Sequence, residues 1–171
     1  MNILHYRLQA EECSILLSTW EHATLDKNLF KETHLKHHFI LVAPNEDIIN
    51  FTYDPFFNLQ HHPAWQISLS HTQNVIVSVL NKKTHAFCIG IDIEHQDRNI
   101  TESVLKWMKR QISDFDHFAN ISTIEKWCRY EAQYKAEQKV KEYLNSKVIA
   151  REFIPLEWQK YMITICKINL I

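Results

Sequence analysis

Two carboxylates lie at the end of a strand-like run over residues 89–94, which reads Ile-Gly-Ile-Asp-Ile-Glu. Asp92 and Glu94 are two residues apart, so both side chains leave the same face of an extended chain, and the isoleucines face the other way. Gly90 shares the carboxylate face and is the only glycine of the chain, although average usage of about 7% would give roughly a dozen. A glycine there would leave room for an approaching ligand. The pattern predicts a site for a divalent cation and an anionic ligand that the cation bridges.

A glutamate and a lysine on a later predicted helix could complete this site. Trp127, Glu131 and Lys135 follow one another at intervals of four, which places them on one helical face. Mg²⁺ is usually held by hard oxygen ligands together with substrate phosphates, and a lysine ammonium can meet a phosphate oxygen as a point charge. The candidate ligands for Mg²⁺ or Mn²⁺ are therefore Asp92, Glu94 and Glu131, with Lys135 as a phosphate contact.

Each half of this pattern also has a purely structural explanation. An Asp and a Glu at a strand end are often solvated, and a Glu–Lys pair at i,i+4 stabilises a helix by only about 0.2–0.5 kcal/mol. Asp92 favours a functional site, because the strand before it is apolar and a buried carboxylate needs a cation or hydrogen-bond donors. Spacing alone leaves both explanations open.

Hydrophobic periodicity and turn residues indicate the elements that must position these residues. The expected order is a strand at 2–7, helices at 8–20 and 26–38, a short strand at 48–53, strands at 65–70, 74–80 and 85–94, helices at 104–112 and 122–144, and strands at 148–154 and 161–168. We expect the helix at 26–38 to carry its lysines and His34 outward. The three middle strands should form an antiparallel meander with a hairpin turn at 81–84. The segment at 44–63 should connect two lobes, residues 1–62 and 63–171.

Composition narrows the classes of protein. A chain of 20.5 kDa with 46% hydrophobic residues can form one domain, or two small lobes that share a core. A formal net charge of -1 argues against a general nucleic-acid or membrane binder. No apolar run approaches the roughly 18 residues of a membrane span. Four widely spaced cysteines and a polar start without a signal-peptide core lead us to expect a cytoplasmic protein.

Three segments, in order, form a recognisable set of motifs. Residues 65–72 read Trp-Gln-Ile-Ser-Leu-Ser-His-Thr, residues 89–94 read Gly-Ile-Asp-Ile-Glu after an isoleucine, and residues 127–136 read Trp-Cys-Arg-Tyr-Glu-Ala-Gln-Tyr-Lys-Ala. They resemble, respectively, the Ser-His strand, the Gly-Ile-Asp-hydrophobic-Glu signature and the Trp-x-x-Lys-Glu-Ala-x-x-Lys-Ala helix of the 4′-phosphopantetheinyl transferase superfamily, in particular the surfactin-synthetase-activating type. The resemblance implies an α+β fold of two similar lobes in a pseudo-two-fold arrangement within one chain, and a monomer.

The resemblance also implies a reaction: transfer of the 4′-phosphopantetheine group from coenzyme A to a serine of an acyl or peptidyl carrier protein. Asp92, Glu94 and Glu131 would hold Mg²⁺ together with the pyrophosphate of coenzyme A. Glu131 would be the base for the serine hydroxyl. Lys135 would contact the phosphates of coenzyme A and stabilise the departing adenosine 3′,5′-bisphosphate.

Further contacts to coenzyme A follow from the same resemblance. Ser70 and His71 would bind its phosphates. A basic helix with Lys31 and Lys36 is similar to the helix by which the family's first lobe contacts the coenzyme.

The sequence departs from the family pattern at two informative positions. Tyr130 stands where the family has a lysine before its glutamate, and Tyr53-Asp54-Pro55 stands where it has Gly-Lys-Pro. These differences support an alternative, a catalytically impaired relative that binds a carrier protein or coenzyme A without turnover. A magnesium-dependent nuclease is a further alternative, because Asp, Glu and Lys also build such sites, but the near-neutral charge argues against it.

Overall fold

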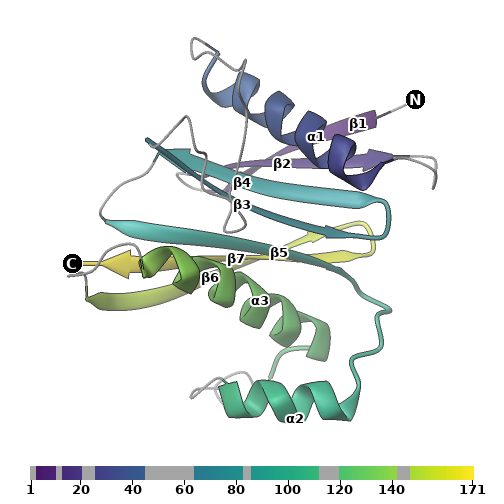
Figure 1. Cartoon of the computed structure of the whole chain (residues 1–171). Coiled ribbons are helices and arrows are strands. Elements are labelled where there is room, and N and C mark those ends of the chain that lie inside the picture. The colour runs from purple at the N-terminus through teal and green to yellow at the C-terminus, as the bar shows by residue number, and fades with distance from the viewer. Residues whose placement is uncertain are drawn as a thin grey trace.

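The computed structural model describes residues 3–10, 13–20, 26–44, 64–82, 86–111, 120–141 and 147–171. These residues form two antiparallel sheets and three helices, which confirms the expected α+β class (Figure 1). The first sheet has the order β1-β2-β4-β3, from β1 (Ile3–Ala10), β2 (Cys13–Trp20), β4 (Val75–Lys82) and β3 (Trp65–Thr72). The second has the order β5-β7-β6, from β5 (Phe87–His95), β7 (Tyr161–Leu170) and β6 (Val148–Trp158). The helices are α1 (Lys27–Val42), α2 (Glu102–Gln111) and α3 (Thr123–Val140).

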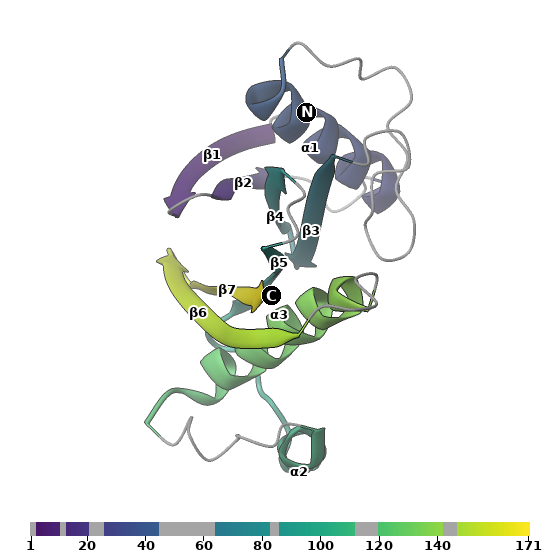
Figure 2. The same cartoon turned by 90° about the vertical axis from the view of Figure 1, so that its left-hand side faces the viewer.

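The two sheets lie between α1 and α3, and the core is layered accordingly. Figure 2 shows α1 on the outer side of the first sheet and α3 on the outer side of the second. Ile15 of β2 and Ile91 of β5 are fully buried in one hydrophobic cluster that the two sheets share. Phe39 of α1 packs in a second cluster on the first sheet, and Ala132 and Ala136 of α3 pack in a third on the second sheet. Both faces of the central strands are therefore covered.

The predicted helix at 8–20 is wrong, because this segment contains most of the β1–β2 hairpin. β2 is buried on both faces, so consecutive residues such as Leu16 and Leu17 are both inaccessible to solvent. A strand buried on both faces shows a continuous apolar run instead of an alternation, and such a run cannot be told from a helix by periodicity.

The predicted meander is correct only in its first two strands. β3 and β4 pair as an antiparallel hairpin, whereas β5 pairs with β7 in the second sheet. The expected hairpin between β4 and β5 is therefore wrong, and residues 83 and 84 of the proposed turn lie outside the described residues. Alternation identifies a strand but not its partner.

The later elements agree more closely with the prediction. α1 extends the helix expected at 26–38, β6 and β7 form the expected closing hairpin, and α2 and α3 lie where helices were expected. Ser122 caps α3 by accepting a hydrogen bond from the Glu125 amide at 3.1 Å, as its capping-box sequence indicates. The short strand expected at 48–53 lies outside the described residues.

The two halves of the fold repeat one connectivity. β2, α1, β3 and β4 follow one another in sequence and give the sheet order β2-β4-β3. β5, α3, β6 and β7 give the corresponding order β5-β7-β6. The expected lobe boundary at 62/63 falls between α1 and β3, whereas the first sheet takes strands from both sides of it.

The edges of the two sheets are joined by side chains of β3 along a line that we call the β3–β5 seam. The Gln66 amide donates to the Phe87 carbonyl at 3.2 Å and accepts from the Ile89 amide at 3.1 Å. Ser68 accepts from the Ile91 amide at 3.0 Å. The backbone groups that β5 turns toward β3 are thus satisfied by side chains, and the seam fixes the register of β3 against β5.

Replacing Gln66 with methionine is expected to lower the free energy of unfolding by about 2–4 kcal/mol, because one donor and one acceptor on β5 lose their buried partners at about 1–3 kcal/mol each. Gln133→Met is the matched control, since the Gln133 amide bonds only to Glu137 of the same helix among the contacts described. Chemical denaturation measures both. Equal stabilities of the two variants would contradict the role of the seam.

A buried network of histidines and serines holds α1 on the first sheet, so His34 points inward and the expectation that it faces solvent is wrong. Successive side chains are 2.6, 2.7, 2.7, 2.6 and 3.1 Å apart along the series His5, Ser18, His34, Ser78, His38 and Ser14. A neutral imidazole donates once and accepts once, so neutral rings satisfy every link.

Burial lowers the pKa of His34 well below its ordinary value, and burial with the nearby charges of Arg7 and His37 lowers the pKa of His38 to about 3. The unfolded chain therefore binds more protons than the folded one below about pH 6.5. The contribution of these two histidines to the free energy of unfolding is fully present above that pH. It decreases as the pH falls, by up to about 1.4 kcal/mol per pH unit for each histidine.

His38→Gln is accordingly expected to reduce the loss of stability between about pH 7 and about pH 5 by up to about 2 kcal/mol. Urea unfolding of the variant and the wild type at both pH values measures the difference. An unchanged pH dependence would show that His38 is not neutral in the folded protein.

Candidate active site

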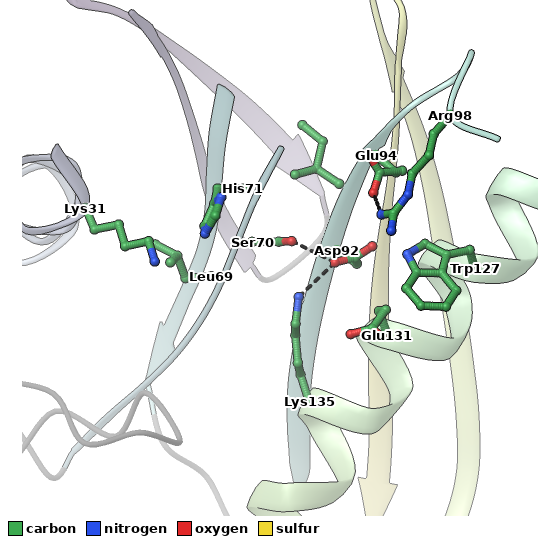
Figure 3. A pocket seen from close by; sticks show the side chains of 11 residues that line it. Lys31, Leu69, Ser70, His71, Asp92, Glu94, Arg98, Trp127, Glu131 and Lys135 are labelled. Carbon is green, nitrogen blue, oxygen red and sulfur yellow. Dashed lines mark hydrogen bonds and ion pairs between the residues drawn. The ribbon is translucent and has the colours of Figure 1, made fainter. Parts of the chain in front are cut away.

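A pocket of about 330 Å³ lies where β3, β5 and α3 meet (Figure 3). Every residue that the sequence singled out for the site lines this pocket except Lys36. The Lys36 ammonium instead forms an ion pair with Glu32 at 2.6 Å on the surface of α1. Lys31, one turn earlier on the same helix, reaches the pocket. The structure thus brings together residues from four elements that are distant in sequence.

Gly90 has a different role from the one that the sequence suggested. A Cβ atom at this position would lie 2.0 Å from the Ala132 carbonyl oxygen and 2.7 Å from the Ala136 amide nitrogen. The space beside Gly90 is therefore filled by the backbone of α3, not kept clear for a ligand. Close approach of α3 to β5 is what carries Glu131 and Lys135 to the carboxylates.

Asp92 is enclosed in the pocket, with 5% of its surface exposed. Its Oδ1 accepts from the Ser70 hydroxyl at 2.7 Å and from the Lys135 ammonium at 2.8 Å. Lys135 also donates to the Ile91 carbonyl at 3.1 Å. Within the described part of the chain, the buried Oδ2 of Asp92 has no hydrogen-bond partner. An unpaired carboxylate oxygen is costly to bury, so this atom is suited to a bound cation.

Glu94 is held by a separate set of donors. Its Oε1 accepts from the Thr72 hydroxyl at 2.7 Å, and its Oε2 accepts from the guanidinium of Arg98. Arg98 in turn lies over the ring of Trp127, 5.1 Å from its centroid. Sequence reasoning missed Arg98, and its only signal is its position four residues after Glu94 in the turn that follows β5.

The pocket perturbs the titration of several of its groups. Burial raises the pKa of Glu131, the nearby charge of Asp92 raises it further, and Lys135 and Arg98 oppose these effects. Burial lowers the pKa of His71, helped by the positive charge of Lys31. The pocket therefore combines a carboxylate that accepts a proton more readily than usual with an imidazole that favours its neutral form.

The donor chemistry of the pocket fits a hard divalent cation. Carboxylates from Asp92, Glu94 and Glu131 line one cavity, and Asp92 contributes the unpaired oxygen. Across the described residues, no three His, Cys, Asp or Glu side chains are gathered closely enough to hold an ion. Lys135 and Arg98 neutralise two of the three carboxylates instead. A cation would have to exchange with these partners.

Tyr130 does not contribute to the pocket. Its ring packs edge-on against Trp107 of α2 at 5.1 Å between centroids, and it lies 6.3 Å from the ring of Trp127. Its neighbour Arg129 pairs with Glu125 at 2.6 Å. A tyrosine at position 130 therefore joins α2 to α3. Asp54, the other departure from the family pattern, lies outside the described residues.

Comparison with known proteins adds no family to this picture. The sequence matches no protein-family model, and no curated protein shows significant similarity to it. Among the described residues, no helix is both long and apolar enough to cross a membrane.

Proposed function

We propose that this protein transfers the 4′-phosphopantetheine group of coenzyme A to a serine of an acyl or peptidyl carrier protein. The observation that carries the proposal is the convergence of the three resembling segments on one pocket. Ser70 and His71 come from β3, Asp92 and Glu94 from β5, and Glu131 and Lys135 from α3. The spacing of residues in the sequence gives no indication that the segment at 65–72 lies next to the other two in space.

The roles follow from the chemistry of each side chain. Asp92, Glu94 and Glu131 would hold Mg²⁺ or Mn²⁺. When bound, the cation would neutralise negative charge on the pyrophosphate of coenzyme A. Glu131 accepts the proton of the attacking serine hydroxyl, because its carboxylate lines the pocket beside Asp92 and Lys135. Lys135 contacts the phosphate oxygens on which negative charge grows as adenosine 3′,5′-bisphosphate departs.

Lys31 and His71 line the same pocket and supply contacts to the phosphates of coenzyme A. The pKa of His71 is lowered in the ligand-free pocket, and either form of its ring can donate one hydrogen bond to a phosphate oxygen. Lys36 takes no part, since it is paired with Glu32 away from the pocket.

The repeated connectivity of the two sheets supports a single-chain pseudo-dimer of two similar lobes. In this arrangement one lobe holds the unit β2, α1, β3 and β4, and the other holds the unit β5, α3, β6 and β7, which moves the proposed boundary from 62/63 to between β4 and β5. The pocket lies at the end of the β3–β5 seam, where these two units meet. The proposal thus includes a pseudo-two-fold arrangement of the two lobes. It also includes the monomeric state and the cytoplasmic location that the sequence leads us to expect.

Incubation with coenzyme A, Mg²⁺ and a panel of apo carrier proteins tests the function. Intact-mass spectrometry should show one added phosphopantetheine group on at least one carrier, and a carrier whose acceptor serine is replaced by alanine should gain none. Absence of a mass gain across fatty-acid, polyketide, peptide and siderophore carriers would refute transferase activity.

A second candidate function is binding of coenzyme A or a carrier protein without turnover. It is favoured by the ion pairs of Asp92 with Lys135 and of Glu94 with Arg98, which balance the pocket's charge without a metal. Calorimetry separates the two functions. Binding of coenzyme A that is unaffected by Glu131→Ala and by Mg²⁺, together with no carrier modification, would establish the binding protein.

A further inference from the structure

Arg98 lies between two cavities. It lines the active-site pocket and also a second cavity of about 520 Å³ beside the N-terminus of α3. Figure 3 shows its guanidinium between Glu94 and Trp127. The Arg98 side chain is 45% exposed, whereas the Glu94 side chain is only 7% exposed. The carboxylate is therefore fixed and enclosed, and the arginine has space on its other side.

We propose that Arg98 is an internal counter-ion that holds Glu94 in the ligand-free protein and releases it when a divalent cation and a phosphate ligand bind together. This inference rests on the proposed function, because it concerns the metal and phosphates of the same pocket. It assigns to Arg98 control over the order and cooperativity of binding.

A divalent cation that binds Glu94 has to replace the guanidinium of Arg98, for an electrostatic reason. Glu94 has two oxygens: Oε1 is occupied by Thr72 and the His95 amide, and Oε2 by Arg98. A divalent ion that reaches Oε2 meets the positive guanidinium, and two like charges in contact with one enclosed carboxylate oxygen repel strongly. The ion must therefore displace Arg98, and this cost weakens its binding to the protein alone.

A phosphate ligand offsets that cost. A guanidinium binds phosphate oxygens through two parallel hydrogen bonds, so the displaced Arg98 gains a partner as strong as the carboxylate that it leaves. The face of Trp127 keeps the guanidinium next to the pocket during the exchange. Cation and phosphate thus favour one another's binding, and by linkage the effect is equal in both directions.

Titration of Mn²⁺ in the absence of any other ligand tests the first half of the proposal. Arg98→Gln removes the competing charge and is expected to bind Mn²⁺ about tenfold more tightly than the wild type, as followed by the electron paramagnetic resonance signal of free Mn²⁺. Arg98→Lys keeps a positive charge at this position, so its affinity for Mn²⁺ should stay close to that of the wild type. Arg129→Gln is the matched control, because Arg129 pairs with Glu125 outside the pocket.

Calorimetry with coenzyme A tests the second half. Mg²⁺ should increase the affinity of the wild type for coenzyme A. The factor of this increase should be larger than the factor measured for Arg98→Gln. Circular dichroism confirms that each variant is folded, and Arg98→Met replaces Arg98→Gln if the latter is not.

Mn²⁺ affinity that is equal or weaker in Arg98→Gln, or an equal effect of Mg²⁺ on coenzyme A binding, would overturn the inference. If the wild type still modifies a carrier protein, such a result leaves the proposed function standing. No Mn²⁺ binding by either protein, in the absence and in the presence of coenzyme A, would overturn the metal site, and with it both proposals.

Discussion

Gly90→Ala is expected to lower the free energy of unfolding by more than about 3 kcal/mol. The added methyl group would lie 2.0 Å from the Ala132 carbonyl oxygen, which is far inside van der Waals contact. That oxygen belongs to the backbone of α3, so no side-chain rotation relieves the clash, and the helix must move away from β5. Chemical denaturation measures the loss of stability.

The same substitution should also abolish carrier modification under conditions where the variant is still folded. Lys135 contacts Asp92, and Glu131 lines the same pocket, only because α3 lies against β5, so displacement of the helix moves both groups. Ala150→Val, at an exposed position on β6 of the same sheet, is the matched control for an enlarged side chain. If Gly90→Ala had the stability of the control, α3 would not approach β5 as closely as described.

Asp92→Asn is expected to reduce the rate of carrier modification about a thousandfold, equivalent to about 4 kcal/mol of transition-state stabilisation. The amide keeps the size of the carboxylate but loses the negative charge that pairs with Lys135 and that would hold the cation. Steady-state kinetics with coenzyme A and a carrier protein gives the ratio of kcat/KM values.

Asp97→Asn makes the same chemical change five residues later and is the matched control. The Asp97 side chain is 81% exposed, so its substitution should leave the rate within about twofold of the wild type. Thermal unfolding of both variants separates a catalytic effect from a loss of structure. Similar rates for Asp92→Asn and Asp97→Asn would remove Asp92 from the catalytic machinery.

The candidate site was more predictable from the sequence than the fold that surrounds it. Period-two spacing placed Asp92 and Glu94 on one face, and period-four spacing did the same for Glu131 and Lys135. These spacings depend on local geometry alone. The sequence could not show that Gly90 accommodates the backbone of α3, because that requires knowledge of which helix packs on which strand.

Long-range partners account for the other errors. The sequence pattern of β2 predicts a helix because both faces of this strand are buried. Alternation alone does not place β5 in the second sheet, because its pairing with β7 spans more than 60 residues. His34 was expected in solvent because histidine is polar, yet Ser18 and Ser78 supply the partners that allow its burial. Arg98 was missed because a single arginine in a turn carries no periodic signal.

The most direct measurement of the central claim is a crystal structure of the protein with coenzyme A and Mn²⁺, with the ion located by its anomalous scattering. We expect the pyrophosphate in the pocket between β3 and α3, with one ion in contact with Asp92, Glu94 and Glu131 and with Arg98 turned from Glu94 to a phosphate oxygen. Coenzyme A bound away from this pocket, or bound in it with no ion at the three carboxylates, would contradict the account.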